Sequence, residues 1–342
     1  MEHCGIDLHT KSSEVAIIDA GGAVREEARI PTTEASFVRY FGRREPMVIC
    51  IEAGGVSAWA QRLLRSLGHE VVVANPLRVR LIAEATLKND AVDAQTLARL
   101  VRADRGLLSP IVHRSERTQR YRGVLRVRRV LVSSRTACVN AARGLLRSQG
   151  YRLPGQLNGQ RLAKAIAAKE LPEELTALVA PLVLTALELD EKIAALNEQV
   201  ATIGASYPEV ALLQTVPGVG PLVALAFVLC LEDPRRFRRS RDIAGYLGLR
   251  PRMRETGSSS RYGGITHAGD GEMRRLLVQA AHGLLRSRAA SDLKQWALGV
   301  ALRVGKKKAV TALARKLAVV LHTMWLTGRA FRPFREVIEV AA

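Results

Sequence analysis

The first hundred residues alternate between short apolar runs and amphipathic segments. The apolar runs are rich in β-branched residues and end at turn residues, which is typical of strands, whereas the segments between them have helical spacing. The strand segments are 4–9, 14–20, 23–30, 47–53 and 70–75, and the helical segments are 32–44 and 57–68. This order predicts a mixed α/β sheet that opens with an antiparallel meander. Beyond Asn75 no segment predicts a strand.

A heptad pattern marks the middle of the chain. Leucine or isoleucine recurs at every seventh position from Leu175 to Ile203, and apolar residues fill the interleaved seam. Such a pattern predicts a coiled coil or a long helical hairpin. Pro181 interrupts it, so we expect the helix to begin there or to be kinked. The stripe suits packing inside the chain's own domain as well as self-association, and we expect a homo-oligomer, either a dimer or a tetramer.

The remaining third is predicted to be helical, apart from a polar loop at 248–269 and a glycine turn within 212–231. Residues 304–325 have the pattern of an amphipathic helix with a basic head. The most apolar stretch, 219–231, is well short of the roughly 20 residues that span a bilayer. The N-terminus has no basic-then-apolar signal pattern, and the four cysteines lack metal or disulfide spacing. We therefore expect a cytoplasmic protein without a membrane partner.

The chain is strongly basic, with 52 Lys and Arg against 32 Asp and Glu and a net charge of +20. Such a balance indicates a polyanionic partner, usually nucleic acid. Residues 105–152 hold twelve arginines, no lysine and one acid, with apolar residues at helical intervals. One sign of charge over this length favours a surface that follows phosphates over a merely solvated helix face. We expect Arg126, Arg128 and Arg129 to bind nucleic acid.

Four acids form a set against this basic background. Asp7 lies on the first strand, and Glu52 ends a later apolar strand, where a lone acid is unusual. Asp90 and Asp93 lie three apart at the head of a helix, where they repel each other or serve only as helix-start residues. A ribonuclease-H-like sheet would gather the four carboxylates, and divalent cations would neutralise them. Paired Mg²⁺ ions would then clamp the attacking and leaving oxygens of a phosphodiester.

The glycine turn has the sequence VPGVGP at 216–221, which is similar to the hairpin of helix-hairpin-helix modules. Gly218 and Gly220 would expose backbone N–H groups at a helix start, which favours binding a DNA phosphate without reading sequence. A tight turn between two packed helices uses the same residue types, so the motif alone leaves both interpretations open.

The loop at 252–261 interleaves arginines with hydroxyl residues. Arg252, Arg254 and Arg261 would hold a phosphate and stabilise its developing charge, while one of the hydroxyls of Thr256, Ser258, Ser259 and Ser260 would attack it. A flexible polar loop is the alternative. No His/Asp triad spacing accompanies these hydroxyls, so their activation would come from the phosphate-binding environment or from the acidic site.

Over nearly its whole length the chain resembles the DEDD-type insertion-sequence transposases of family one-ten, recombinases guided by a structured bridge RNA. The segments that carry the resemblance are GIDLHTKSSEVAIID, IEAGG, NDAVDAQTLARL, LLQTVPGVGPLVA, AGYLGLRPRMRETGSSSRYGGITHAGDGEMRRLLVQAA and GKKKAVTALARKLAVVL. The resemblance implies that the DEDD residues are Asp7, Glu52, Asp90 and Asp93. It implies an α/β plus α fold in three regions.

These implied regions are a RuvC-like, ribonuclease-H-like mixed sheet at 1–110, a basic helical and coiled-coil region at 111–205, and a mostly helical transposase domain at 206–342 with a helix-hairpin-helix-like element. The family's C-terminal domain carries an essential serine followed by glycine. In this chain Gly257 follows Thr256 instead, so the nucleophile is Thr256 or, after a small loop shift, Ser258.

We expect a transposase that binds DNA and a guide RNA. It would cleave and rejoin DNA through a hydroxyl-linked covalent intermediate, with a Mg²⁺-binding DEDD site in the same catalytic centre. The alternatives are a RuvC-like metal-dependent junction nuclease that uses water, and a non-catalytic nucleic-acid-binding protein.

Overall fold

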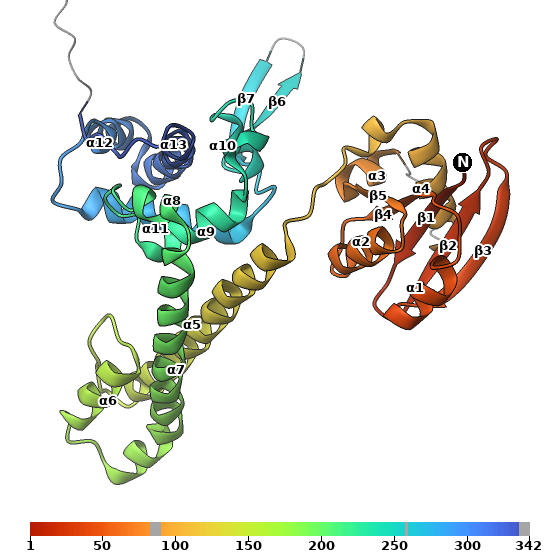
Figure 1. The fold of residues 1–342 in the computed structure, drawn as a ribbon. Coiled ribbons are helices and arrows are strands. Elements are labelled where there is room, and N and C mark those ends of the chain that lie inside the picture. Colours follow the sequence, from red (N-terminus) through yellow and green to blue (C-terminus); the bar gives the residue numbers. More distant parts are fainter. Residues whose placement is uncertain (83–89, 257–258, 335–342) are drawn as a thin grey trace, which may run out of the picture. The chain divides into compact units, whose positions relative to one another are not determined.

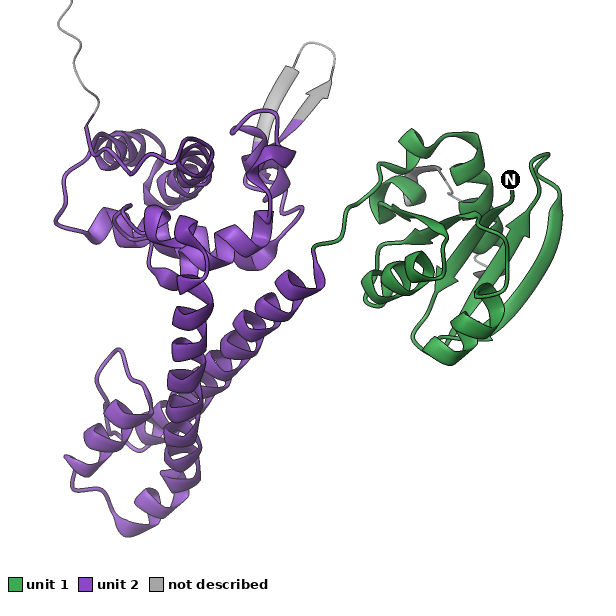
Figure 2. Cartoon of the chain, in the orientation of Figure 1, with its two compact units in different colours: residues 1–114 green, residues 115–342 purple. Residues whose placement is uncertain are grey.

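The computed structural model describes residues 1–82, 90–256 and 259–334 of the chain (Figure 1). These residues form two compact units, unit 1 from Met1 to Arg114 and unit 2 from Ser115 to the C-terminus (Figure 2). Each unit has its own hydrophobic core, and each is described here by itself.

Unit 1 is built on a five-stranded sheet with the order β3-β2-β1-β4-β5 (Figure 1). Its strands are β1 His3–Leu8, β2 Ser12–Ile18, β3 Val24–Pro31, β4 Val48–Glu52 and β5 Glu70–Ala74. The first three pair antiparallel, β4 lies parallel to β1, and β5 lies parallel to β4. The prediction of a mixed sheet that opens with an antiparallel meander is confirmed.

Helices cover both faces of this sheet. They are α1 Glu34–Phe41, α2 Ser57–Ser66, α3 Pro76–Ile82, α4 Asp90–Ala103 and the 3-10 turn η1 Arg105–Leu108. Strand residues alternate between faces, so odd-numbered Ile49 and Ile51 pack with Phe37 of α1 in one cluster. Even-numbered residues of β4 face the other way, where they pack with apolar residues of α4.

The contact between β1 and α4 is made by backbone. A Cβ on Gly5 would lie 2.0 Å from the carbonyl oxygen of Ala94 and 2.5 Å from the amide nitrogen of Ala98. Both alanines are fully buried. Because glycine and alanine present almost no side chain, the helix lies directly on the strand at this point. No larger residue at position 5 is compatible with this approach.

Unit 2 begins with a long antiparallel helical hairpin. Its helices are α5 Glu116–Ser148 and α7 Glu173–Ala205, with α6 Gly159–Ala167 in the connection (Figure 1). The heptad stripe of α7 is buried at Val179, Ala186, Ile193 and Val200. The predicted long helical hairpin is confirmed. Helix α7 runs through Pro181 from Glu173, so the expectation that it begins at the proline was wrong.

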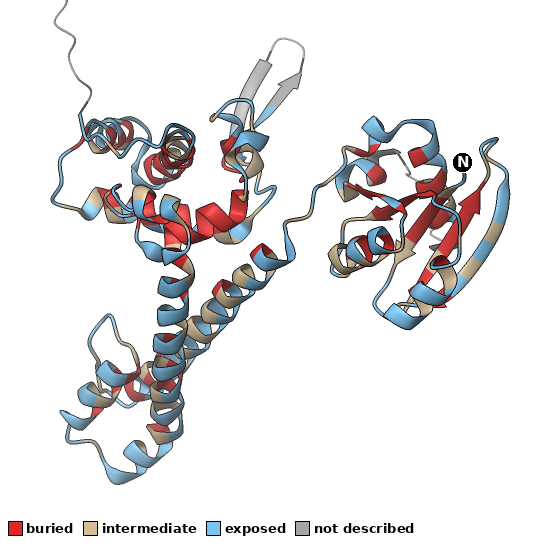
Figure 3. Cartoon of the chain, in the orientation of Figure 1, coloured by how far each residue is buried: buried red, intermediate tan, exposed pale blue. Residues whose placement is uncertain are grey.

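The rest of unit 2 is a helical bundle with one hairpin. Its helices are α8 Pro208–Leu213, α9 Pro221–Leu231, η2 Pro234–Arg236, α10 Asp242–Tyr246, α11 Gly271–Arg286, α12 Asp292–Val304 and α13 Lys306–Thr327. Every residue of α9 from Val223 onward is buried, as Figure 3 shows. Among the described residues, α13 alone is long and apolar enough to cross a membrane, but half of its apolar window is buried against other helices of the bundle. It is a core helix.

A two-stranded sheet, β6 Pro251–Thr256 and β7 Ser259–Ile265, projects from the bundle. The expectation of a loop at 248–269, with no strand after Asn75, was therefore wrong. The hairpin escapes a pattern-based prediction because its strands are mostly polar and carry no alternating apolar face. Its strands are held by cross-strand pairing, with Met253 opposite Tyr262.

Substituting Gly5 by alanine should destabilise unit 1 by about 1–3 kcal/mol, the usual cost of overpacking. The new methyl group would have to displace the α4 backbone at Ala94. Urea unfolding followed by circular dichroism measures the loss. Gly54→Ala is the control, because nothing lies within 4 Å of the Cβ position there. Equal stabilities of the two variants would contradict the backbone contact.

Candidate active site and nucleic-acid interface

Two of the four acids lie on neighbouring parallel strands. Gly5 is in register with Cys50, and Ile6 with Ile51, so Asp7 and Glu52 follow at the carboxyl ends of β1 and β4. Side-chain alternation puts both acids on the face of the sheet that α4 covers, since Gly5 and Cys50 lie on that face. Burial raises the pKa of Cys50 to about 12, with a smaller contribution from the charge of Glu52.

The other two acids belong to the helix that lies on this face. Asp93 immediately precedes Ala94, which contacts Gly5, and Asp90 begins the helix. The opposite end of α4 lies toward the start of β1, because Arg102 donates to the carbonyl oxygen of Ala20, which closely follows the partner of His3 on β2. The first turn of α4 therefore lies toward the end of β1 that carries Asp7. The side chain of Asp90 lies outside the described residues.

The donor chemistry of this edge suits Mg²⁺, which prefers carboxylate oxygens. Within the described part of the chain, however, no group of three or more His, Cys, Asp or Glu side chains is arranged to hold a metal ion. The Asp7 carboxylate instead lies 3.0 Å from Nε2 of His9. The strands and α4 thus bring the acids to one face and one end of the sheet, without a closed coordination shell among the described side chains.

The predicted hydroxyl loop belongs to the β6–β7 hairpin. Thr256 ends β6 and is in register with Ser259, and Arg254 is in register with Arg261. Arg252 is exposed near the start of the hairpin. The side chains of Arg254, Thr256 and Arg261 lie outside the described residues, and so does the whole of Ser258. The nucleophile therefore stays a prediction.

Two glycines fix the base of this hairpin. Gly248 and Gly269 both have positive φ, +66° and +75°. A Cβ on Gly248 would lie 2.0 Å from the carbonyl oxygen of Ala268, and one on Gly269 would lie 2.0 Å from that of Tyr246. The segments before and after the hairpin therefore cross in backbone contact. Arg274 ties the crossing together by donating to the carbonyl oxygens of Leu247 and Ala268.

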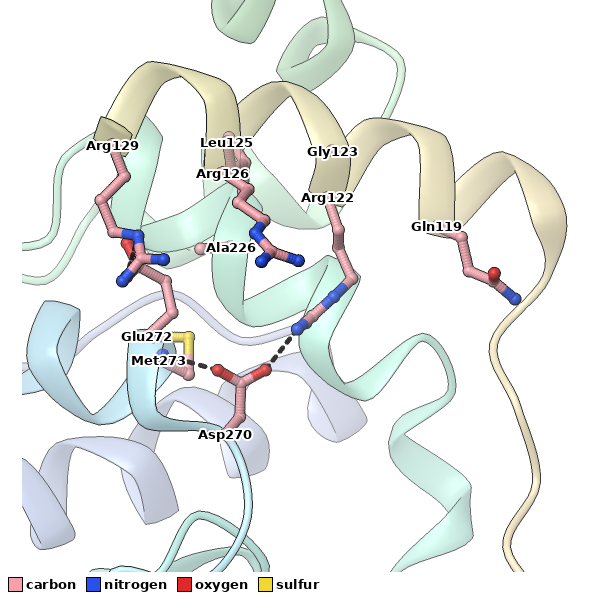
Figure 4. A pocket seen from close by; sticks show the side chains of 10 residues that line it. All are labelled: Gln119, Arg122, Gly123, Leu125, Arg126, Arg129, Ala226, Asp270, Glu272 and Met273. Carbon is pink, nitrogen blue, oxygen red and sulfur yellow. Dashed lines mark hydrogen bonds and ion pairs between the residues drawn. The ribbon is translucent and has the colours of Figure 1, made fainter. Parts of the chain in front are cut away.

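Asp270 follows this crossing and has two structural functions (Figure 4). Its carboxylate caps α11 by accepting from the N–H of Met273 at 3.0 Å. It also pairs with Nη2 of Arg122 on α5 at 2.5 Å. Burial alone would raise the pKa of Asp270, but the Arg122 guanidinium and the Met273 N–H hold it below its ordinary value. The sequence analysis did not single out this residue, although it ends the stretch GITHAGD in one of the segments that carry the family resemblance.

Several arginines of the basic stretch are also paired within the chain. Nε of Arg129 lies 3.2 Å from Glu272, and Nη1 of Arg135 lies 2.6 Å from Asp190. Nε of Arg128 donates to the side-chain oxygen of Asn197 at 2.6 Å. These partners come from α7 and α11, so no local window of the sequence shows them.

Arg126 differs from its neighbours. It is exposed and points into a pocket of about 410 Å³ between α5 and the start of α11, beside Arg122 and Arg129 (Figure 4). Those two are neutralised by Asp270 and Glu272, whereas Arg126 makes no ion pair among the described residues. Of the three arginines predicted to bind nucleic acid, Arg129 pairs with Glu272 and Arg128 donates to the neutral amide of Asn197, so Arg126 alone has no side-chain partner among the described residues.

The two glycines of the turn between α8 and α9 differ in their surroundings. Gly218 has a φ of +87°, and a Cβ there would lie 2.5 Å from the amide nitrogen of Leu284, so the turn packs against α11. Gly220 is the N-cap residue of α9, and nothing lies within 4 Å of its Cβ position. Gly218 thus has a packing function, while a phosphate contact at Gly220 stays a prediction.

Comparison with known proteins identifies the family. A model described as "Transposase IS116/IS110/IS902 family" matches residues 210–296, and one for DEDD transposases of IS110, described as "Transposase", matches residues 4–149. A probable family 20 transposase of Pseudomonas aeruginosa is 30% identical over 97% of this chain and 99% of its own. The chain belongs to the IS110 family of transposases. The predicted resemblance is confirmed.

Two further relatives of this family carry insertion-sequence names. The transposase for insertion sequence element IS1111A of Coxiella burnetii is 28% identical over 96% of this chain and 90% of its own. The transposase for element IS1328 of Yersinia enterocolitica is 28% identical over 96% of this chain and 97% of its own. As an IS110-family transposase, the protein is an enzyme that acts on DNA. The two family matches contain, respectively, the glycine crossing with Asp270 and the sheet with its acids.

Replacing Asp270 by asparagine should destabilise unit 2 by roughly 1.5–3 kcal/mol at neutral pH, as expected for a charge-assisted hydrogen bond lost from a partly buried pair. Asparagine can still cap α11, so the loss of stability measures the contribution of the carboxylate charge. Because its folded pKa is lowered, the Asp270 charge stabilises the fold above its ordinary pKa near 3.9, and this contribution is lost as the pH falls through the folded value.

Urea unfolding between pH 3 and pH 7 tests this dependence. The difference between wild type and Asp270→Asn should begin to shrink below about pH 4, where the carboxylate of the unfolded wild-type chain takes up a proton while the folded one is still charged. Asp233→Asn is the matched control, because Asp233 is an exposed cap without an ion pair among the described residues. A pH-independent difference would show that the Arg122 pair contributes nothing.

Proposed function

We propose that this transposase is a recombinase that cleaves and rejoins DNA through a covalent protein–DNA intermediate, assisted by Mg²⁺ at the four acids. The observation that carries the proposal is the convergence of Asp7, Glu52 and the first turn of α4 on one face and one end of the sheet. A sheet with three antiparallel strands followed by two parallel ones is ribonuclease-H-like, and we assign unit 1 to the RuvC-like class on that ground.

Mg²⁺ would be held by carboxylate oxygens of Asp7, Glu52, Asp90 and Asp93. When bound, it supplies positive charge that stabilises the oxygens of a reacting phosphodiester. Carboxylates gathered at one edge would repel DNA phosphates until cations neutralise them.

The covalent step would use a hydroxyl of the β6–β7 hairpin, from Thr256 or Ser258. Its oxygen forms a bond to the scissile phosphorus, the bond to one deoxyribose oxygen breaks, and the proton passes to that leaving oxygen. The phosphate ester to the protein retains the bond energy, so attack by another deoxyribose hydroxyl rejoins the strand. Arg252, Arg254 and Arg261 would stabilise the charge that develops on the phosphate.

Guide RNA is the proposed source of sequence specificity. No segment of the chain has the spacing of a base-reading recognition helix, whereas its net charge of +20 suits a second nucleic acid. The uncompensated Arg126 on α5 supports a backbone contact from this helix. We expect the recombinase to act as a dimer or tetramer, with partly exposed heptad residues such as Leu196 available to a second copy.

Two other functions fit part of these observations. A junction nuclease that uses water would need the acids but not the hydroxyls. A non-catalytic binder would need neither. The hydroxyl-rich hairpin, anchored by the glycine crossing at its base, favours the recombinase over both.

Trapping of the intermediate tests the proposal. Wild type incubated with labelled DNA of the element's ends and Mg²⁺ should yield a labelled species of protein size on a denaturing gel. Either Thr256→Ala or Ser258→Ala should abolish it, and mass spectrometry of the adduct identifies the modified residue. Asp7→Asn should also abolish it with both hydroxyls intact, because the metal site is lost.

Each other outcome favours an alternative. Mg²⁺-dependent nicking without an adduct indicates the nuclease, and DNA binding with neither nicking nor adduct indicates the binder. Circular dichroism of each variant serves as the control for folding.

A second prediction concerns the RNA. Arg126→Gln should weaken binding of the RNA that travels with the protein and reduce the slope of log affinity against log salt by roughly 0.7–0.9, the value for one phosphate contact. Arg129→Gln removes the same charge from a group already paired with Glu272, so its slope should change little. Filter binding over a potassium chloride series measures both. Site-specific recombination after complete RNase digestion would refute the RNA-guided function.

A further inference from the structure

A large pocket lies beside the hairpin, and none of the functions above uses it. It has a volume of about 1100 Å³ and is formed by the base of β6–β7 together with α12 and α13. Gly263 and Gly264 of β7 line one side, Trp296 of α12 lines another, and the first four turns of α13 line the rest. Nothing lies within 4 Å of the Cβ position of Gly264, so the strand leaves open space here.

The charges of this pocket are all of one sign. Lys307, Lys308, Arg315 and Lys316 line it, and no acidic residue is among its described lining. The first three make no ion pair within the described chain. The pocket beside Asp270 differs in this respect, because two of its three arginines pair with Asp270 and Glu272 at the start of α11. Uncompensated cations around a concave surface indicate an anionic ligand.

The pocket also has an aromatic and apolar wall. The indole of Trp296 is 37% exposed, and the ammonium of Lys316 lies 4.1 Å from its ring centroid. Ile265 and Val319 add aliphatic surface. An inorganic anion would leave this wall unused. A ligand that combines phosphate with a flat ring fits both parts, since bases pack on aromatic side chains at about 1–3 kcal/mol each.

We propose that this pocket binds an unstacked nucleotide of the DNA strand that is being cleaved, with its phosphates at Lys307 and Lys308 and its base against Trp296. The inference rests on the proposed function, because it treats the β6–β7 hairpin as the element that meets the scissile strand. The pocket is lined by β7, whose first residue is in register with Thr256. A nucleotide held there would fix the strand relative to the hydroxyl loop.

Fluorescence of Trp296 tests the pocket without catalysis. The chain has three tryptophans, so full-length protein with Trp59→Phe and Trp325→Phe reports on Trp296 alone. A thymidine tetranucleotide should quench it. An abasic tetranucleotide of equal charge should not quench, and in competition it should bind roughly 5- to 150-fold more weakly, the factor that corresponds to one stacked base. The difference between wild type and Trp296→Phe gives the same signal if the double variant does not fold.

The lysines have a matched control on the same helix. Lys307→Gln with Lys308→Gln should weaken binding and lower the salt slope by roughly 0.7 per phosphate lost. Lys306→Gln, whose side chain is exposed but outside the pocket lining, should change neither. Equal effects at Lys306 would overturn the assignment, as would an absence of quenching or equal quenching by the abasic strand.

Two further probes separate the alternatives. Stronger quenching by a uridine tetraribonucleotide, or by an acidic tetrapeptide, would overturn the assignment in favour of RNA or of a protein partner. The Thr256→Ala and Ser258→Ala variants should keep full quenching, because the pocket does not use the nucleophile. If the wild type forms the adduct but its fluorescence is not quenched, the pocket assignment is refuted and the covalent mechanism stands. If the fluorescence is quenched but no adduct forms, only the covalent mechanism is refuted.

Discussion

The backbone contact between Gly5 of β1 and Ala94 of α4 is the constraint on which the acidic edge of unit 1 depends. Residues on one face of a strand lie two positions apart, so the glycine that admits the helix determines that Asp7 lies under the same helix. The contact of Ala94 with this glycine likewise determines where Asp93 lies, because Asp93 immediately precedes Ala94 on α4. One contact without side chains therefore sets the spacing of acids from two elements that are distant in the sequence.

In unit 2, ion pairs between helices determine how the basic helix α5 packs. Helix α5 carries a row of arginines whose repulsion would oppose close packing if it were not compensated. Asp270, Glu272 and Asp190 come from other helices and neutralise Arg122, Arg129 and Arg135. A long basic segment is thus part of the electrostatics of the folded unit, and its remaining cations form the proposed surface for nucleic acid.

The sequence predicts the sheet, its opening meander and the helical hairpin because each has a hydrophobic period that depends only on nearby residues. It does not predict β6–β7, whose polar strands are stabilised by cross-strand pairing and by the crossing at Gly248 and Gly269. It also does not show the partner of Arg122, since the separation along the chain hides the pair. Asp7 and Glu52 could be named as candidates from their strands, but the face that they share follows only from the strand register.

The two kinds of cation in unit 2 differ in a way that matches their surroundings. Arginines predominate on α5, where a planar guanidinium forms directed hydrogen bonds to a fixed carboxylate or amide, as Arg128 does with Asn197. Lysines predominate at the start of α13, where a mobile ammonium on a flexible stem can follow a phosphate whose position changes during a reaction. In the proposed mechanism, a strand that is cleaved and rejoined moves relative to the enzyme. Tolerance of that movement would be a physical reason for the lysine-lined pocket to lie beside the hairpin, with the arginine pairs in the helical framework.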